Sequence, residues 1–110
     1  MDERGRRIGR NEAFFREANE RIEQLSQKLE TTGGRLEILC ECGDPGCHER
    51  IEITMVDYER VRSDPTHFAT ARGHEQPDVE TVVENRDGYV VVRKAEGPPA
   101  EIAEKLDPRS

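Results

Sequence analysis

Residues 36–53 read LEILCECGDPGCHERIEI, and this stretch decides the fold. On both sides of its Gly-Asp-Pro-Gly segment, apolar residues alternate with polar ones, at Leu36, Ile38, Ile51 and Ile53. Alternation with a period of two is typical of a half-buried strand, and Gly, Asp and Pro are the residues that tight turns favour. The stretch therefore predicts two strands that pair antiparallel, with three cysteines gathered around the turn.

The cysteines of this stretch, Cys40, Cys42 and Cys47, have a spacing suited to metal ligation. Residues i and i+2 of a strand point to the same side, so Cys40 and Cys42 can face one ion, and the turn can bring Cys47 back to it. Three cysteines cannot form a closed set of disulfides, whereas three cysteines and one histidine are a usual tetrahedral zinc site. The pattern predicts one structural zinc ion, with an iron–sulfur cluster as the alternative.

The fourth ligand is expected from the chain's three histidines. His48 directly follows Cys47, which would strain attachment of both residues to one ion, and His67 adjoins a predicted strand. His74 lies in a Gly-His-Glu loop that can turn inward, with Glu75 available as an outer hydrogen-bonding group. We predict His74 as the fourth ligand, and His67 and His48 remain the alternatives.

A long N-terminal helix is predicted for residues 11–30. Asn11 is a favourable N-cap, and the Thr-Thr-Gly-Gly segment that follows residue 30 favours termination. Apolar residues recur at spacings of three and four, with Phe14 beside them: Phe15, Ala18, Ile22, Leu25 and Leu29. Glu20 and Glu23 are expected on the opposite, solvated face. The apolar stripe is expected to pack on the sheet, or to bind a partner protein or a second copy of the chain.

Further elements follow along the chain. Thr54 and Asp57 have capping-box spacing, which predicts the start of a short helix that ends at residues 63–65. A short strand is expected at 68–71. Two valine-rich runs around Asn-Arg-Asp-Gly predict a hairpin whose second strand is central. A weak helix is expected at 100–106.

Together these elements predict an α+β fold with a small antiparallel sheet of four or five strands, one long N-terminal helix, one short helix and a zinc knuckle. The expected organisation is a disordered basic arm, a single zinc-stabilised domain and a weakly ordered C-terminal tail, at residues 1–10, 11–97 and 98–110. Hydrophobic residues make up 33% of the chain and charged residues 37%. Such a thin core gains stability from a metal cross-link.

The charge of the chain bears on its partners and its location. Its net charge is −7, which repels nucleic acids and anionic membranes as a whole. The basic arm is the exception, and a nucleic-acid contact through it is an alternative, by way of Arg4, Arg6, Arg7 and Arg10. No apolar stretch approaches the length of a membrane span, and no secretory signal is visible. The chain is therefore expected to be cytoplasmic, where cysteines stay reduced.

The sequence resembles a family of small, uncharacterised actinobacterial proteins. The resemblance covers most of the chain and is carried by residues 10–17, by Cys-Glu-Cys-Gly-Asp-Pro at 40–45 with Cys47, by Gly-His-Glu at 73–75, and by 87–92. It implies that the start of the long helix, the cysteines and the Gly-His-Glu element occur together, which supports His74 as a ligand. It implies no activity.

These features favour a zinc-stabilised protein-interaction module with a regulatory role. A nucleic-acid-associated regulator and a thiol–zinc redox switch are the alternatives. Catalysis is not favoured, because the sequence shows no Ser-His-Asp arrangement and no phosphate-binding glycine loop. The acidic residues near the cysteines and His74 in the sequence could in principle act as a general base beside a metal, but we expect them to be solvated: Glu41, Asp44, Glu49 and Glu75.

Overall fold

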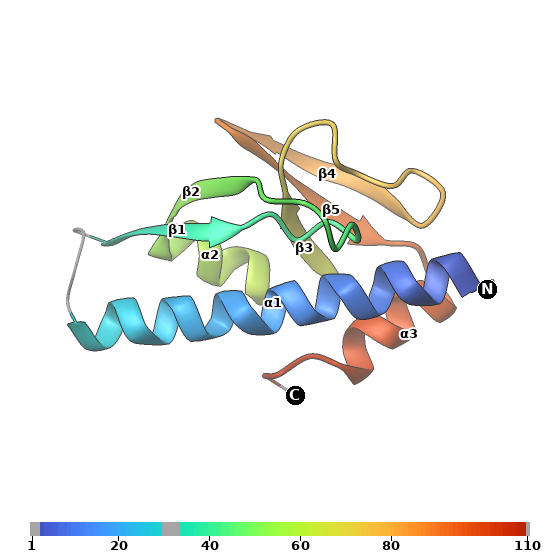
Figure 1. The fold of residues 1–110 in the computed structure, drawn as a ribbon, viewed down its shortest axis with the longest axis horizontal. Coiled ribbons are helices and arrows are strands. Elements are labelled where there is room, and N and C mark those ends of the chain that lie inside the picture. The colour runs from blue at the N-terminus through green and yellow to red at the C-terminus, as the bar shows by residue number, and fades with distance from the viewer. Residues whose placement is uncertain (1–2, 30–33, 110) are drawn as a thin grey trace.

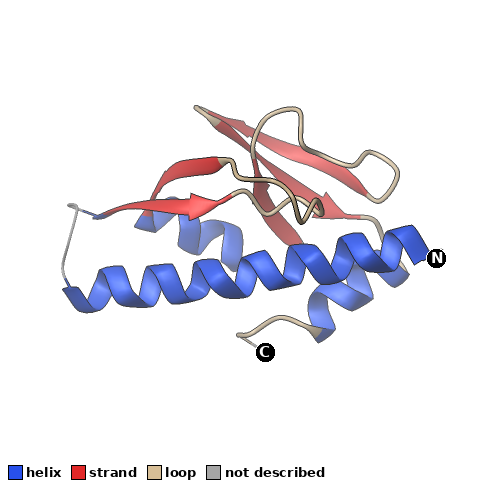
Figure 2. Cartoon of the chain, in the orientation of Figure 1, coloured by secondary structure: helices blue, strands red, loops and turns tan. Residues whose placement is uncertain are grey.

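The computed structural model describes residues 3–29 and 34–109. Its elements are, in chain order, α1 (Glu3–Leu29), β1 (Arg35–Leu39), β2 (Arg50–Thr54), α2 (Met55–Arg62), β3 (His67–Thr70), β4 (Glu80–Arg86), β5 (Tyr89–Lys94) and α3 (Pro98–Lys105). The predicted α+β class is confirmed, and α1 runs along the length of the molecule (Figures 1 and 2). No helix among these residues is both long enough and apolar enough to cross a membrane.

The five strands form two antiparallel sheets rather than one. β1 pairs antiparallel with β2, as predicted, and Leu36 lies opposite Ile53. The second sheet has the order β3-β5-β4. The predicted hairpin and the central place of β5 are confirmed, and Gly88 in its turn has φ +88°, a backbone conformation that favours glycine. The Glu41 backbone N–H donates to the Ala69 carbonyl at 2.9 Å, so the chain that leaves β1 joins the two sheets.

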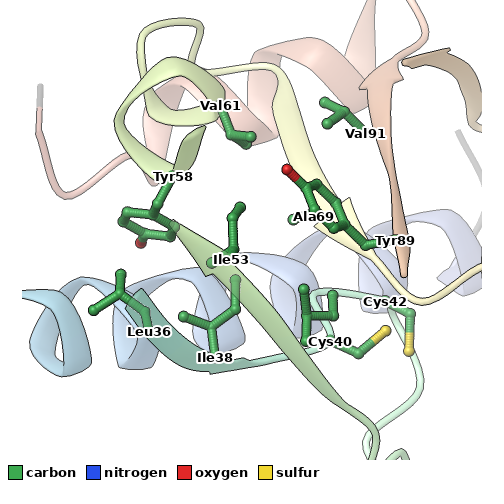
Figure 3. Packing of buried hydrophobic residues seen from close by; sticks show 11 residues of the cluster. Leu36, Ile38, Cys40, Cys42, Ile53, Tyr58, Val61, Ala69, Tyr89 and Val91 are labelled. Atoms are coloured by element: carbon green, nitrogen blue, oxygen red, sulfur yellow. The ribbon is translucent and has the colours of Figure 1, made fainter. Parts of the chain in front are cut away.

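The main core lies between the two sheets and α2 (Figure 3). Ile38 and Ile53 of the two-stranded sheet pack in one cluster with Tyr58 of α2 and Val91 of β5. The N-cap of α2 follows the prediction, because the Thr54 hydroxyl accepts a hydrogen bond from the Asp57 backbone N–H at 3.1 Å. Cys40 and Cys42 belong to the same cluster, so the cysteines extend the edge of the core.

The N-terminal helix begins earlier than the sequence suggested. The predicted start was Asn11, with residues 1–10 as a disordered arm, whereas α1 begins at Glu3. Ile8 is buried, so residues before Asn11 contribute to packing. The Asn11 side chain does not cap the helix but donates to the Gly43 carbonyl at 3.0 Å. The last residue of the predicted helix, 30, lies outside the described residues.

The buried face of α1 is polar, which corrects the predicted orientation. Glu20 and Glu23, expected in solvent, are buried, while Phe14 and Leu25 are 67% and 57% exposed. Besides Ile8 and Ala13, the buried side chains within residues 3–26 of α1 are polar: Glu12, Arg16, Asn19, Glu20 and Glu23. These groups are accommodated because most of them find buried charged or carbonyl partners, such as Arg62, whose Nε donates to Glu20 at 2.7 Å. Apolar spacing predicted the helix correctly but not the face that it buries.

The C-terminal segment is docked rather than weakly ordered. α3 begins with Pro98 and Pro99 in its first turn, where the backbone N–H that proline lacks would have no partner within the helix. Ala103 of α3 is buried against β5 residues. Beyond α3, Arg109 Nη2 donates to Glu23 at 3.2 Å and to Glu59 at 2.6 Å. Residues 98–109 therefore link α1 to α2.

Candidate metal centre

The structure brings the four predicted ligands, Cys40, Cys42, Cys47 and His74, to one place. One candidate ligand atom from each residue lies within 4.8 Å of the others. His74 Nδ1 is 3.5 Å from Cys47 Sγ and 3.7 Å from Cys40 Sγ. A tetrahedral zinc ion with ordinary bond lengths separates sulfur and nitrogen ligands by about 3.6 Å. The donor set and its spacing therefore fit a Cys₃His zinc site.

The chain that carries Cys40 and Cys42 is fixed from both sides. Asn19 of α1 accepts from the Leu39 backbone N–H at 2.8 Å and donates to the Leu39 carbonyl at 2.9 Å. The Glu41 side chain points away from the cysteines, as strand alternation requires. It is fully buried and accepts from Asn19 at 2.8 Å and from the Ala69 backbone N–H at 2.9 Å. These bonds fix the direction of both cysteine side chains.

Two loops supply the other ligands. In the first, the Asp44 carboxylate accepts from the Gly46 N–H at 2.8 Å and its carbonyl from the Cys47 N–H at 3.1 Å, which turns Cys47 back. In the second, the His74 N–H donates to the Ala71 carbonyl at 3.0 Å, and Gly73 has φ +90°. The Ala71 N–H also donates to Cys40 Sγ at 3.1 Å. Such N–H donors stabilise thiolate charge.

The first turns of α1 hold both ligand loops. Asn11 donates to the carbonyl of Gly43, next to Cys42. On the other loop, Arg4 donates to Gln76 Oε1 at 2.8 Å and forms an ion pair with Asp78, both shortly after His74. The position of α1 and the assembly of the centre are therefore linked through direct contacts.

The three thiols differ in their proton affinity. Hydrogen bonding to Cys42, followed by burial, raises the pKa of Cys40. The same hydrogen bond, with the Cys40 thiol as donor, lowers the pKa of Cys42 to about 5. Burial raises the pKa of Cys47. Cys42 is therefore the first of the three thiols to lose its proton, and a bound cation would favour the loss of the other protons.

The other residues considered from the sequence lie outside the centre. His48 is exposed, and His67 Nε2 lies 3.4 Å from Asp64 Oδ2. Glu75 accepts from the Gly73 N–H at 3.0 Å, and Glu41 is buried away from solvent, which corrects the expectation that it is solvated. Sequence reasoning missed Asn19, because a polar residue within a helix carries no signal that it will face a strand end.

Comparisons with known proteins give no relative. Searches against protein-family models, curated proteins and solved structures each found no significant match. The function must therefore be inferred from the geometry of the chain itself.

Proposed function

We propose that the chain is a zinc-stabilised protein-interaction module in which the metal centre holds α1 in place for a partner. The observation that carries this proposal is the convergence of Cys40, Cys42, Cys47 and His74 within 4.8 Å. Four protein ligands leave no open position on a tetrahedral ion, so the zinc is structural.

A structural ion fits the needs of this fold. The main core is small, and the loops that bear Cys47 and His74 have no regular secondary structure. Binding of zinc to such loops is coupled to their folding. The ion joins residues from the β1–β2 connection to the loop after β3, and both loops contact α1.

The partner surface is assigned to the outer flank of α1. Phe14 and Leu25 are 67% and 57% exposed, and Phe15, Ala18 and Ile22 lie half-buried between them. Large exposed apolar side chains that share one surface are typical of binding sites. A partner helix or a second copy of the chain could cover this flank.

The proposed metal site is tested by replacing His74 and, as a matched control, His67. His74→Ala is expected to weaken zinc binding by at least roughly 100-fold, because it removes a ligand, while His67→Ala leaves it unchanged. Titration with cobalt(II), followed by its visible absorption, reports the loss of tetrahedral geometry directly. Equal affinities and spectra for the two variants would contradict the proposed ligand set.

The proposed surface is tested separately by the double substitution Phe14→Ser and Leu25→Ser. Light scattering should show whether the zinc-loaded chain self-associates, and cross-linking in extracts of cells that express it should show protein partners. The double variant is expected to lose the self-association or the partner binding that the unchanged chain shows. Its zinc content should stay unchanged. Retention of every association would exclude this flank of α1 as the interface.

A further inference from the structure

Folding separates the charges of α1 between its two faces. Residues 3–26 contain five glutamates and six arginines, so the helix looks nearly neutral in sequence. Glu12, Glu20 and Glu23 are buried, and each has a basic partner: Lys94 for Glu12, and Arg109 for the other two. The glutamates that remain exposed are Glu3 and Glu17, against five exposed arginines. The solvent face of α1 is therefore basic, although the chain as a whole is acidic.

Several arginines of this face are available to a ligand. Arg6 and Arg7 are exposed and have no acidic partner within residues 3–29 and 34–109. Arg10 has one exposed partner, Glu3, at 3.3 Å. Ion pairs between side chains this exposed contribute little to stability, so a ligand can readily replace one partner. The arginines of the first three turns can therefore turn toward an anion.

An exposed aromatic ring follows these arginines on the same side of the helix. Phe14 lies one turn after Arg10, which itself lies one turn after Arg7, a spacing that brings side chains together. Its ring is 67% exposed and contacts the Phe15 ring edge-on at 5.8 Å between centroids. Basic side chains followed by a free aromatic face form the combination that binds single strands without sequence preference.

A polar hollow adjoins the same arginines. It encloses about 350 Å³ between α1 and the β1–β2 connection, and Arg4, Arg7, Asn11 and Gln76 line it. Its acidic lining residue, Asp44, uses its carboxylate to accept from the Gly46 N–H. This volume is at the lower end of small-ligand pockets, so the hollow could receive a sugar or phosphate group.

We propose that the outer face of α1 binds single-stranded nucleic acid, with phosphates on Arg6, Arg7 and Arg10 and a base stacked on Phe14. A nucleic acid fits better than an acidic peptide, because a convex helix face offers few pockets for peptide side chains, whereas a base needs only a ring to stack on. A single strand fits better than a duplex, whose bases are already stacked. The proposal goes beyond the protein-interaction role and does not depend on it.

The test is fluorescence anisotropy of labelled oligothymidylate, about 20 nucleotides long, with the zinc-loaded chain at low salt. Binding should weaken with salt with a logarithmic slope of about −2, as three phosphate contacts to a single strand predict. The double variant Arg6→Gln/Arg7→Gln should weaken binding and bring the slope close to −0.7. Phe14→Ser should weaken binding roughly tenfold with the slope unchanged, because it removes stacking only.

The matched control is Arg35→Gln/Arg93→Gln. Both arginines are exposed on strands. Arg93 points to the opposite side of β5 from its neighbour Lys94, which contacts Glu12 of α1. This control removes the same charge and should bind like the unchanged chain. Melting temperatures must agree across the set, as expected for substitutions of exposed side chains.

Several results would overturn the proposal. Absence of oligothymidylate binding at low salt would do so. Equal losses of affinity in the control and in the α1 arginine variant would also do so, since binding would then follow net charge alone. Binding of a labelled acidic peptide, but not of oligothymidylate, would assign the face to acidic proteins instead. Zinc content measured on the same samples keeps a failure of the metal site distinct from a failure of this surface.

Discussion

Gly43, next to Cys42, packs tightly against α1. A Cβ at this position would lie 2.5 Å from Ile8 Cγ2 and 2.9 Å from Ile8 Cα, closer than atoms can pack. We therefore predict that Gly43→Ala destabilises the zinc-loaded chain by about 1–3 kcal/mol, measured by urea unfolding.

Gly46, in the same turn, provides the control. A Cβ there would meet only Asp44 Oδ1, at 3.4 Å, so Gly46→Ala should change the free energy of unfolding by less than about 1 kcal/mol. If the two alanines were equally harmful, the contact between Ile8 and Gly43 could not be the cause.

Asn19 carries a second prediction at this scale. Asn19→Ala would remove the side-chain hydrogen bonds to both Leu39 backbone groups and one of the two to the buried Glu41 carboxylate, which would keep only the bond from the Ala69 N–H. An unsatisfied buried polar group costs about 1–3 kcal/mol, so we expect a loss of about 3 kcal/mol of stability and weaker zinc binding. Asn11→Ala, which loses one bond to Gly43, should cost about 1 kcal/mol. Equal, small losses for both would show that Asn19 does not support the strand end.

The clustering of the three cysteines with His74 could be predicted from the sequence because the chemistry of these side chains is local. Cysteine spacing on a strand fixes the direction of Cys40 and Cys42, and few histidines compete for the fourth place. The residues that hold the centre in place could not be predicted, because Asn19 and Gly43 act through contacts with segments distant in the sequence.

At the scale of elements, α1 shows how side-chain pairing can override apolar spacing. Its face toward the second sheet is fixed by Lys94, whose Nζ lies 2.6 Å from Glu12 and 3.0 Å from Glu80, all three buried. Removal of one partner from a buried ionic group typically costs about 3–5 kcal/mol. Lys94→Met should therefore destabilise the fold by about 3 kcal/mol in urea unfolding.

The neighbouring Arg93, exposed on the same strand, serves as the comparison. Arg93→Met should stay within about 0.5 kcal/mol of the unchanged chain. A Lys94→Met variant as stable as Arg93→Met would show that the buried group contributes nothing to the packing of α1.

At the scale of the whole molecule, the buried carboxyl groups of α1 make stability depend on pH. Burial, with Glu80 nearby, raises the pKa of Glu12 well above its usual value. Burial also raises the pKa of Glu23 to about 8. The folded chain keeps protons that the unfolded chain releases near pH 4.5, so this contribution to stability falls as pH rises above that value.

The Glu12→Gln variant tests this dependence, because glutamine cannot lose a proton. With zinc saturating, its stability relative to the unchanged chain should rise as the pH increases above about 4.5, by about 1.4 kcal/mol for each pH unit crossed below the folded-state pKa of Glu12. The metal site contributes equally to both proteins and cancels. Parallel stability curves for the two proteins would show that Glu12 is ionised in the folded state.

The overall class was predictable, whereas the arrangement of its parts was predictable only in part. Alternation and turn residues identified both hairpin-like pairs, β1 with β2 and β4 with β5. The contact between the two sheets depends on the backbone hydrogen bond from the Glu41 N–H to the Ala69 carbonyl, which leaves no pattern in composition. The early start of α1 and the docked C-terminus likewise depend on distant ion pairs, such as those of Arg4 and Arg109.

The central claim is that Cys40, Cys42, Cys47 and His74 hold one structural zinc ion. Elemental analysis of protein purified under reducing conditions, without added metal, tests it most directly. We predict one zinc per chain, and none in a Cys42→Ser variant, which should also lose its folded circular dichroism spectrum. A chain without metal, with three titratable thiols and an unchanged fold, would contradict it.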